Sequence, residues 1–495
     1  MKNHLDNVQL KYRFVVHETF TRKDIVVKNV FVGALLVFTA TLLSELVSAA
    51  ESSVPPPAQW TTEHSTSPLR DYLAKEDTSF HWHKIREGEI AGTKYVELIL
   101  TSQTWRQIVW KHRLFIVMPE NVAANTNALL IIAGGKWKEE YADLSYEGSP
   151  VKEAVLFASL AQQLESPVAV LLQVPQQPIF DGKKEDEIIS YTFEQYLDTG
   201  DPEWPLLLPM VRSAVKGMDA IQEFCEAEWS LSIDSFTVTG GSKRGWTTWL
   251  TGASDTRVTA IAPMVIDMLN LKVQMDHQQD TWGEFSEQIH DYTERNIPER
   301  MKTAAGEALL QIVDPLAYRE SLKLPKLLIL GTNDPYWTLD ALNLYWSQLL
   351  GQKHILYVPN NGHGLQDFPR VLGGVQALHE QAAGGDKLPE LTWSFDEARD
   401  KVTLSINSNV QPHKCQVWIA TSKSSDFRES LWIASEMTAS NDAYTFQVDL
   451  PKTGSKAFFG EVLFARKHLP LYLSTNVRIV RAAEVALPRD QGLSD

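Results

Sequence analysis

The sequence predicts an α/β domain with a mostly parallel sheet covered by helices on both faces, followed by a C-terminal β-sandwich. Between residues 128 and 358, apolar runs of strand length alternate with helical patterns. Strands that are apolar throughout are typical of a buried parallel sheet. Beyond residue 386 the apolar residues recur with a period of two, in short segments separated by turn residues, as in a sandwich.

Within the α/β part, each element follows from its local pattern. Three strand patterns come first, at 80–84, 94–101 and 112–118. Buried parallel strands are expected at 128–133, 167–174, 235–239, 258–265, 326–330 and 354–358. Helices are expected at 149–164, with Ser149-Pro150 as N-cap and first helical residue, at 206–225, and from Trp246 onward.

The stretch at about 268–318 is longer than a crossover between strands needs. It carries helical patterns at 282–292 and 299–312. Two interpretations stay open: a helical lid over the strand ends, or packing helices without a gating role.

The predicted organisation has five parts: a signal peptide or N-terminal anchor (1–50), a linker (51–66), an α/β domain (67–386), a β-sandwich (387–482) and a C-terminal tail (483–495). The sandwich strands are expected at 391–395, 402–406, 417–419, 444–448, 458–464 and 471–480.

The N-terminal pattern predicts export. An apolar run at 30–43 follows Arg22, Lys23 and Lys28, and small residues suited to cleavage end the segment at 47–50. The run is short for a membrane span, so a secreted or periplasmic protein is expected. The alternative is an uncleaved anchor, because the segment ahead of the run is long for a signal. The membrane would then be contacted only through this segment.

Composition excludes several function classes. The net charge of -16 and the absence of a basic run argue against nucleic acid as a partner. Two cysteines cannot form a disulfide framework or a cysteine-based metal site. No phosphate-loop, dinucleotide or zinc motif occurs, so no cofactor is expected. The acidic run at 185–187 is interpreted as a solvated loop, with a calcium site as the alternative.

The stretch VTGGSKRGWTTWL, at 238–250, places Ser242 between a predicted strand and a predicted helix. Ser242 is either an N-cap or a nucleophile on a strained turn. The G-x-S-x-G elbow of α/β-hydrolases matches Gly240 and Ser242, but the second glycine comes one place late, as Gly245. This shift is tolerable only if the Arg244 side chain points away from the strand and Gly245 supplies the close approach.

Two later strands end in turns that carry the other members of a catalytic triad. Asp334 follows the strand at 326–330, and His363 follows the strand at 354–358. Serine, acid and histidine thus occur in the chain order of α/β-hydrolases. A serine hydroxyl needs a histidine to accept its proton and a carboxylate to orient that histidine. Asp267, after the strand at 258–265, is the alternative acid.

An oxyanion hole requires two backbone N–H donors. Lys243, directly after the serine, is expected to supply one. The glycine turn after the first parallel strand, at Gly135 and Lys136, is expected to supply the second, although this turn is alternatively a simple tight connection.

Arg244 has two candidate roles. Its guanidinium is expected to pair with a carboxylate of the scaffold, because burying it unpaired would be very costly. The alternative is a clamp for an anionic group of the substrate.

Several specific stretches resemble the PhoPQ-activated pathogenicity-related protein family, from about residue 69 to residue 480. They are LRDYLAKEDTSFHW, LTSQTWR, VTGGSKRGWTTWL, APMVIDMLN, GTNDPYW, NGHGL, SSDFRESLW and LSTNVRIV. The resemblance implies a secreted or periplasmic protein with an α/β-hydrolase fold and Ser242, Asp334 and His363 at the presumed catalytic positions. It implies no particular substrate.

The sequence therefore predicts a secreted serine hydrolase that forms an acyl-enzyme on Ser242. Its substrate would be a small-molecule ester or a peptide. The alternative is a catalytically idle hydrolase scaffold that binds a peptide or an envelope component.

Overall fold

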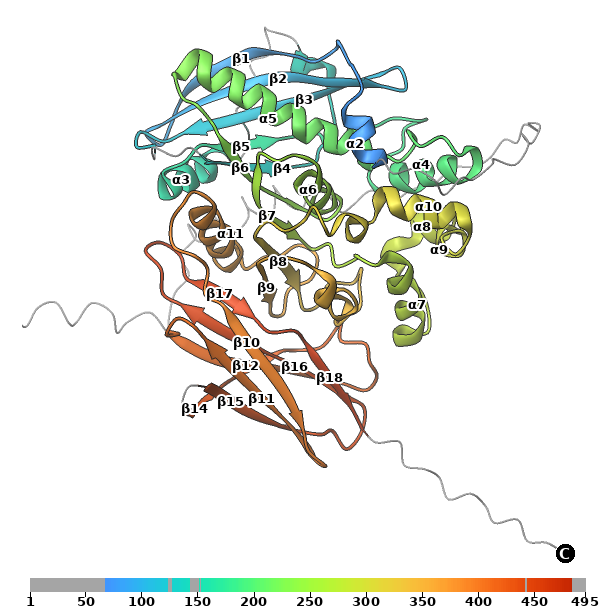
Figure 1. Cartoon of the computed structure of the whole chain (residues 1–495), viewed down its shortest axis with the longest axis vertical. Helices are drawn as coiled ribbons and strands as arrows, with labels where there is room; N and C mark the ends of the chain where they lie inside the picture. The colour runs from blue at the N-terminus through green and yellow to red at the C-terminus, as the bar shows by residue number, and fades with distance from the viewer. Residues whose placement is uncertain (1–66, 123–126, 143–150, 152, 441–442, 483–495) are drawn as a thin grey trace, which may run out of the picture.

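The computed structural model describes residues 67–122, 127–142, 151, 153–440 and 443–482 (Figure 1). The predicted signal or anchor, the linker, the C-terminal tail and the Ser149-Pro150 helix start lie outside the described residues. Across the described ranges, no helix is both long and apolar enough to cross a membrane.

In the described part of the chain, nine strands form one sheet, in the order β1-β2-β3-β5-β4-β6-β7-β8-β9. They are β1 (His81–Ile90), β2 (Thr93–Trp105), β3 (Ile108–Met118), β4 (Asn127–Ile132), β5 (Val168–Leu171), β6 (Ser235–Gly241), β7 (Val258–Met264), β8 (Lys326–Gly331) and β9 (Lys353–Val358). Strands β1 to β3 pair antiparallel, β3 pairs antiparallel with β5, and the strands from β5 to β9 are parallel. The predicted mostly parallel sheet is confirmed.

Alternate residues of the parallel strands enter two separate hydrophobic cores. Leu130 belongs to one core and its neighbour Leu129 to the other, and both are fully buried. Helices complete these cores from both sides: α5 (Leu207–Trp229) and α6 (Lys243–Ser254) on one, α3 (Ala154–Leu164) and α11 (Phe368–Ala382) on the other. Because both faces are covered, these strands need apolar residues at consecutive positions.

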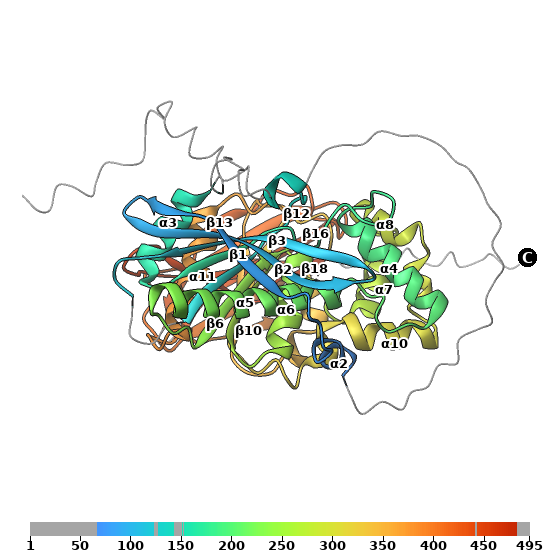
Figure 2. The same cartoon turned by 90° about the horizontal axis from the view of Figure 1, so that it is seen from above.

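Short helices fill the chain between β7 and β8. They are α7 (Leu271–Trp282), η2 (Glu287–Ile289), α8 (His290–Thr293), α9 (Ile297–Arg300), α10 (Ala304–Val313) and η3 (Pro315–Tyr318). The predicted helix over 282–292 is wrong, because Gly283 takes a left-handed conformation (φ 79°) that closes α7 at Trp282. Helices α7, α8 and α10 gather at one end of the molecule with α4 (Asp186–Thr199) (Figure 1 and Figure 2).

The C-terminal region forms two antiparallel sheets, β10-β11-β15-β14 and β13-β12-β16-β17, with β18 paired to β16. The strands are β10 (Leu391–Glu397), β11 (Lys401–Ser408), β12 (Lys414–Ser422), β13 (Ile433–Glu436), β14 (Thr438–Ser440), β15 (Ala443–Asp449), β16 (Ser455–Phe464), β17 (Leu471–Ser474) and β18 (Arg478–Arg481). Leu404, Val417 and Phe458 share one core, as expected for a sandwich. The strand predicted over 471–480 is two strands, β17 and β18.

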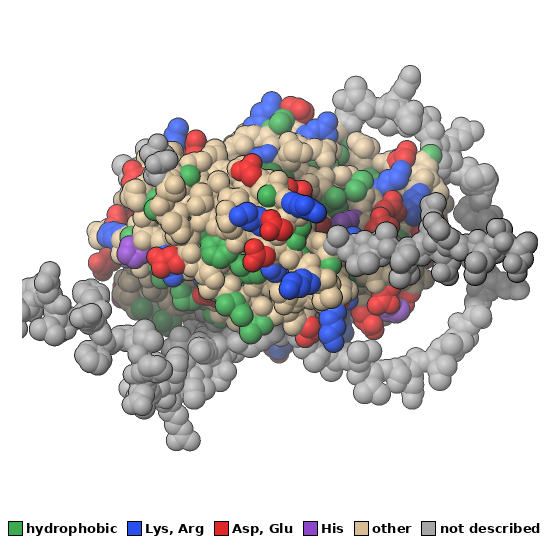
Figure 3. All heavy atoms as spheres, turned by 90° about the horizontal axis from the view of Figure 1, so that it is seen from below, with side chains coloured by type: hydrophobic (Ala, Val, Ile, Leu, Met, Phe, Trp, Pro, Cys, Tyr) green, Lys and Arg blue, Asp and Glu red, His purple; other side chains and the backbone are tan. Residues whose placement is uncertain are grey.

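Charged side chains of both signs are interspersed on the face of the molecule where the sandwich lies. Seen from below, Lys and Arg side chains lie next to Asp and Glu (Figure 3). Ion pairs in this region include Arg478 with Glu397 and Arg428 with Asp426.

The turn between β6 and α6 generates a prediction about Gly245. A Cβ added at Gly245 would lie 2.7 Å from Ile266 Cγ2 and 2.9 Å from Met264 O. Since backbone must shift to make room, Gly245→Ala should lower the free energy of unfolding by about 2 kcal/mol or more. Gly241→Ala is the matched control, because the nearest atom, Val265 Cγ2, is 3.9 Å away. Urea unfolding measures both variants, and equal stability of the two would contradict the close approach.

Candidate active site

Ser242 stands on a sharp turn between β6 and α6 with φ 57° and ψ -129°. A non-glycine residue in this region costs about 1–3 kcal/mol, so the surroundings must hold it there. Its N–H donates to Met264 O at 2.9 Å, and a Cβ at Gly245 would lie 3.0 Å from Gly240 O. The Ser242 side chain makes no capping hydrogen bond to α6. Ser242 is therefore on a strained elbow, and Gly245 supplies the predicted close approach.

His363 is bound to Asp334, as the sequence predicts. Its Nδ1 lies 2.9 Å from Asp334 Oδ2 and 3.1 Å from Oδ1. The Tyr336 ring stacks on the imidazole with 4.1 Å between centroids, and Tyr336 N–H donates to Asp334 Oδ1 at 3.0 Å. With the Nδ1 proton directed at the carboxylate, Nε2 carries the lone pair. Nε2 is buried and has no hydrogen-bond partner among the described residues, so Ser242 and His363 are not bonded to each other here.

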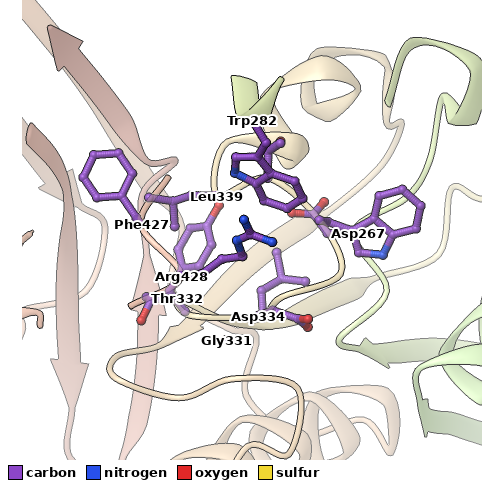
Figure 4. A pocket seen from close by; sticks show the side chains of 12 residues that line it. Asp267, Trp282, Gly331, Thr332, Asp334, Leu339, Phe427 and Arg428 are labelled. Carbon is purple, nitrogen blue, oxygen red and sulfur yellow. The ribbon is translucent and has the colours of Figure 1, made fainter. Parts of the chain in front are cut away.

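Asp267, the alternative acid, has a different partner. Its Oδ1 accepts a hydrogen bond from Tyr345 Oη at 2.6 Å, and the residue is 7% exposed. Burial raises the pKa of Asp267 to about 7, against the effect of this hydrogen bond. Asp267 and Asp334 line the same pocket (Figure 4). Of the two carboxylates, Asp334 is the one bound to His363.

Ser242, His363 and Lys243 line one pocket. Much of its wall comes from the helices between β7 and β8: Leu271 and Met275 of α7, Ile297 and Pro298 of α9, and Met301. These helices therefore enclose the space above the serine, which is where a lid would lie. Gating by them stays a prediction.

Of the predicted oxyanion donors, Lys243 lines the pocket, whereas Gly135 and Lys136 do not. Lys243 lines the pocket at the start of α6. Gly135 and Lys136 lie in the loop after β4, the parallel neighbour of β6, but neither lines the pocket. Gly135 has a φ of 114°, and its carbonyl accepts a hydrogen bond from Gln177 Nε2 at 3.1 Å. The loop is thus at the same sheet edge as Ser242 without reaching the pocket lining.

Arg244 is 2% exposed and bound to the scaffold. Its guanidinium donates to both oxygens of Glu185, at 2.7 and 3.0 Å, and also to Val174 O. The expected structural pairing is confirmed. A buried guanidinium held in this way does not clamp a substrate anion, so that alternative is wrong.

The acidic run at 185–187 is not a solvated loop, because Glu185 and Asp186 form ion pairs with Lys243 and Arg244 at the start of α6. Lys243 Nζ lies 2.8 Å from Asp186 Oδ2 and 3.1 Å from Glu185 Oε2, and Asp186 begins helix α4. Burial opposes the charge of Glu185, yet Arg244 and Lys243 hold its pKa well below the usual range. Burial likewise opposes the charge of Lys243, while Asp186 and Glu185 raise its pKa. Within the described ranges, no group of three or more side chains is arranged to hold a metal ion.

Two asparagines join the loops that carry Asp334 and His363 to the C-terminal region. Asn333 Nδ2 donates to the carbonyls of Arg428 at 3.0 Å and Ser430 at 2.8 Å. Asn360 exchanges two hydrogen bonds with the backbone of Trp432, at 3.0 and 2.7 Å. Figure 4 shows Arg428 between Trp282 and the loop that carries Asp334. Its guanidinium carbon lies 4.2 Å from the ring centroid of Trp282. The 427–432 segment therefore supports both loops.

The sequence pointed to no role in the site for Tyr336, Asn333 and Asn360, and it placed Glu185 in a solvated loop. A buried cation at Arg244 predicts that some carboxylate meets it, but no local pattern selects Glu185. Tyr336 lies in the same GTNDPYW stretch as Asp334, which was the available signal. Both asparagines resemble ordinary turn residues in sequence.

Removing the Glu185 charge tests the ion-pair cluster of Lys243 and Arg244 with Glu185 and Asp186. Glu185→Gln leaves two buried cations short of a carboxylate and should cost about 3–5 kcal/mol of stability at neutral pH. Glu187→Gln is the control, because its side chain is 42% exposed and pairs with Lys183 at 3.6 Å, so about 0.5 kcal/mol or less is expected.

The same variant has a pH signature. The folded pKa of Glu185 lies below its unfolded value, so its contribution is complete above the unfolded pKa and is lost as the pH falls toward the folded one. Urea unfolding should therefore show the deficit of Glu185→Gln shrinking below roughly pH 4. Equal, pH-independent effects of both variants would contradict the ion pair.

Comparisons with known proteins agree with the resemblance seen in the sequence. The family model "PhoPQ-activated pathogenicity-related protein" matches residues 69–428. Autocrine proliferation repressor protein A of Dictyostelium discoideum is 30% identical over 443 residues, covering 82% of this chain and 87% of its own. Among solved structures, acetyl xylan esterase 1 from Thermoanaerobacterium sp. JW/SL YS485 is 13% identical and covers 60% of this chain and 87% of its own, with a TM-score of 0.41. A glucuronoyl esterase from Solibacter usitatus is 12% identical over 64% of this chain and 91% of its own, with a TM-score of 0.38. The chain belongs to the PhoPQ-activated pathogenicity-related protein family.

Proposed function

We propose that this protein is a serine hydrolase that cleaves an ester or amide bond through an acyl-enzyme on Ser242. One observation carries the proposal: a serine on a strained elbow and a histidine bound to an aspartate line the same pocket. These three residue types in this chain order are those of the α/β-hydrolase triad.

The proposed reaction begins when Ser242 Oγ attacks the carbonyl carbon of the substrate and its proton passes to His363 Nε2. Asp334 keeps the imidazole in the tautomer that accepts this proton and stabilises the imidazolium that forms. The tetrahedral intermediate then collapses, and Nε2 returns the proton to the departing alcohol or amine. Water, activated by the same histidine, releases the acid from Ser242.

The developing oxyanion needs donors that are already in place. The Lys243 N–H, at the start of α6, is proposed as one donor. The loop carrying Gly135 and Lys136 is proposed as the source of the second, which requires that it approach the pocket when substrate binds. Such tightening is common, since catalytic hydrogen bonds are often long in the free enzyme.

The proposal includes export, so the protein would act in the periplasm or outside the cell. Support comes from the N-terminal sequence, where basic residues, an apolar run and small residues follow one another.

The alternative, an idle hydrolase scaffold that binds a peptide or an envelope component, drew its support from the displaced glycine and from Arg244. Gly245 makes the close approach from its displaced position, and Arg244 is satisfied by Glu185. Neither departure therefore argues against a working nucleophile.

A fluorophosphonate probe tests the nucleophile. Wild type should be labelled at one serine, and Ser242→Ala should lose labelling and hydrolyse activated esters about 10⁴-fold more slowly or worse. Ser254→Ala, at the other end of α6, is the control and should be labelled like wild type. Mass spectrometry and circular dichroism report labelling and folding. A folded Ser242→Ala variant that retains activity would refute the assignment, and an unlabelled wild type would favour the idle scaffold.

Two isosteric variants test which acid orients the histidine. Asp334→Asn should lower turnover by roughly 10²–10⁴-fold, because only Asp334 bonds to His363. Asp267→Asn keeps the acceptor for Tyr345 and should change turnover less than about tenfold. Steady-state kinetics at one pH compares them, and the reverse ranking would transfer the role to Asp267.

A further inference from the structure

The pocket above Ser242 is apolar over most of its wall. Beyond the serine and the histidine, aliphatic and aromatic side chains surround it, among them Trp246 of α6, Met275 of α7, Ile297 of α9 and Met301, which directly follows α9. Met275 is 4% exposed and Met301 is 2% exposed, so these flexible side chains lie in the interior. Methionines adapt to apolar partners of irregular shape.

The charged groups of the wall are already neutralised. Lys243 Nζ pairs with Asp186 and Glu185, and Tyr292 Oη donates to Asp186 Oδ1 at 3.0 Å. Lys243 is 6% exposed, so little water reaches it. Arg244, the neighbouring cation, is bound to both oxygens of Glu185. A charged substrate group entering this pocket would lose its hydration without gaining a counter-ion, which is strongly unfavourable.

We propose that this pocket binds an uncharged, apolar acyl group, so that the substrates are esters or amides of hydrophobic carboxylic acids. The inference rests on the proposed function, because it takes Ser242 as the attacking group. It adds the specificity: the helices between β7 and β8 select the acyl group by size and by lack of charge. Met275 and Met301 are the specificity-determining residues, since they line the pocket without belonging to the triad or the ion-pair cluster.

The test measures how fast the full chain is labelled by fluorophosphonates whose phosphorus-bound chain lengthens from methyl to octyl. Ser242 Oγ forms a bond to phosphorus, fluoride leaves, and the hydroxyl proton passes to His363, so the readout is independent of whether the natural bond is ester or amide. We expect the second-order rate constant to rise roughly tenfold or more from methyl to hexyl. A hexyl chain that ends in a carboxylate should react roughly tenfold or more slowly than the plain chain.

Two variants on α7 distinguish an effect of filling the pocket from a general effect of placing a tryptophan on this helix. Met275→Trp fills the pocket and should lower the hexyl-to-methyl ratio about tenfold. Val273→Trp is the matched control, because Val273 lies on α7 but is 41% exposed, and the ratio should not change. Should Met275→Trp fail to fold by circular dichroism, Met301→Ala provides the opposite test, since a larger pocket should move the preference to longer chains.

The outcomes distinguish this inference from the function on which it rests. Labelling of Ser242 at equal rates along the series, or faster labelling by the carboxylate-ended chain, would overturn the apolar specificity and leave the nucleophile in place. An unchanged ratio in Met275→Trp would do the same. No labelling of Ser242 by any probe would overturn the proposed function and the inference together.

Discussion

The ion pair between Arg244 and Glu185 is the interaction on which the rest of the site depends. Arg244 is 2% exposed and both carboxylate oxygens accept from it, so its burial relies on this partner. Desolvating both charges offsets much of their attraction, which makes the pair a geometric constraint more than a source of net stability. Glu185 also accepts from Gln177, whose side chain holds the carbonyl of Gly135. One carboxylate thus connects the helix after the serine to the glycine loop.

That constraint explains how the elbow at Ser242 keeps its conformation although its second glycine comes one place late, at Gly245. The helix after Ser242 must approach β7 closely, and a Cβ at Gly245 would meet Ile266 and Met264. Moving the glycine to this position puts Arg244 two residues after the serine, where its long cationic side chain needs a buried partner. Glu185, at the start of α4, supplies that partner. The elbow with its displaced glycine and the acidic run therefore form one structural unit.

Much of the sheet could be predicted because each buried parallel strand is a continuous apolar run ending in turn residues. The positions of Ser242, Asp334 and His363 at the ends of strands could be predicted for the same reason, since each follows such a run. What could not be predicted depends on contacts between distant segments: Glu185 with Arg244, and Asn333 and Asn360 with the 427–432 segment. Local pattern also failed for β13 and β14, whose largely exposed residues show no alternation.

A crystal structure of the full chain after reaction with an alkyl fluorophosphonate tests the proposed nucleophile and the apolar pocket most directly. We expect phosphorus bonded to Ser242 Oγ, a phosphoryl oxygen within hydrogen-bond distance of the Lys243 N–H, and the alkyl chain between α7 and α9. The Arg244–Glu185 pair should be intact in that structure. Phosphorus on another residue, or an alkyl chain directed away from the pocket, would contradict these proposals.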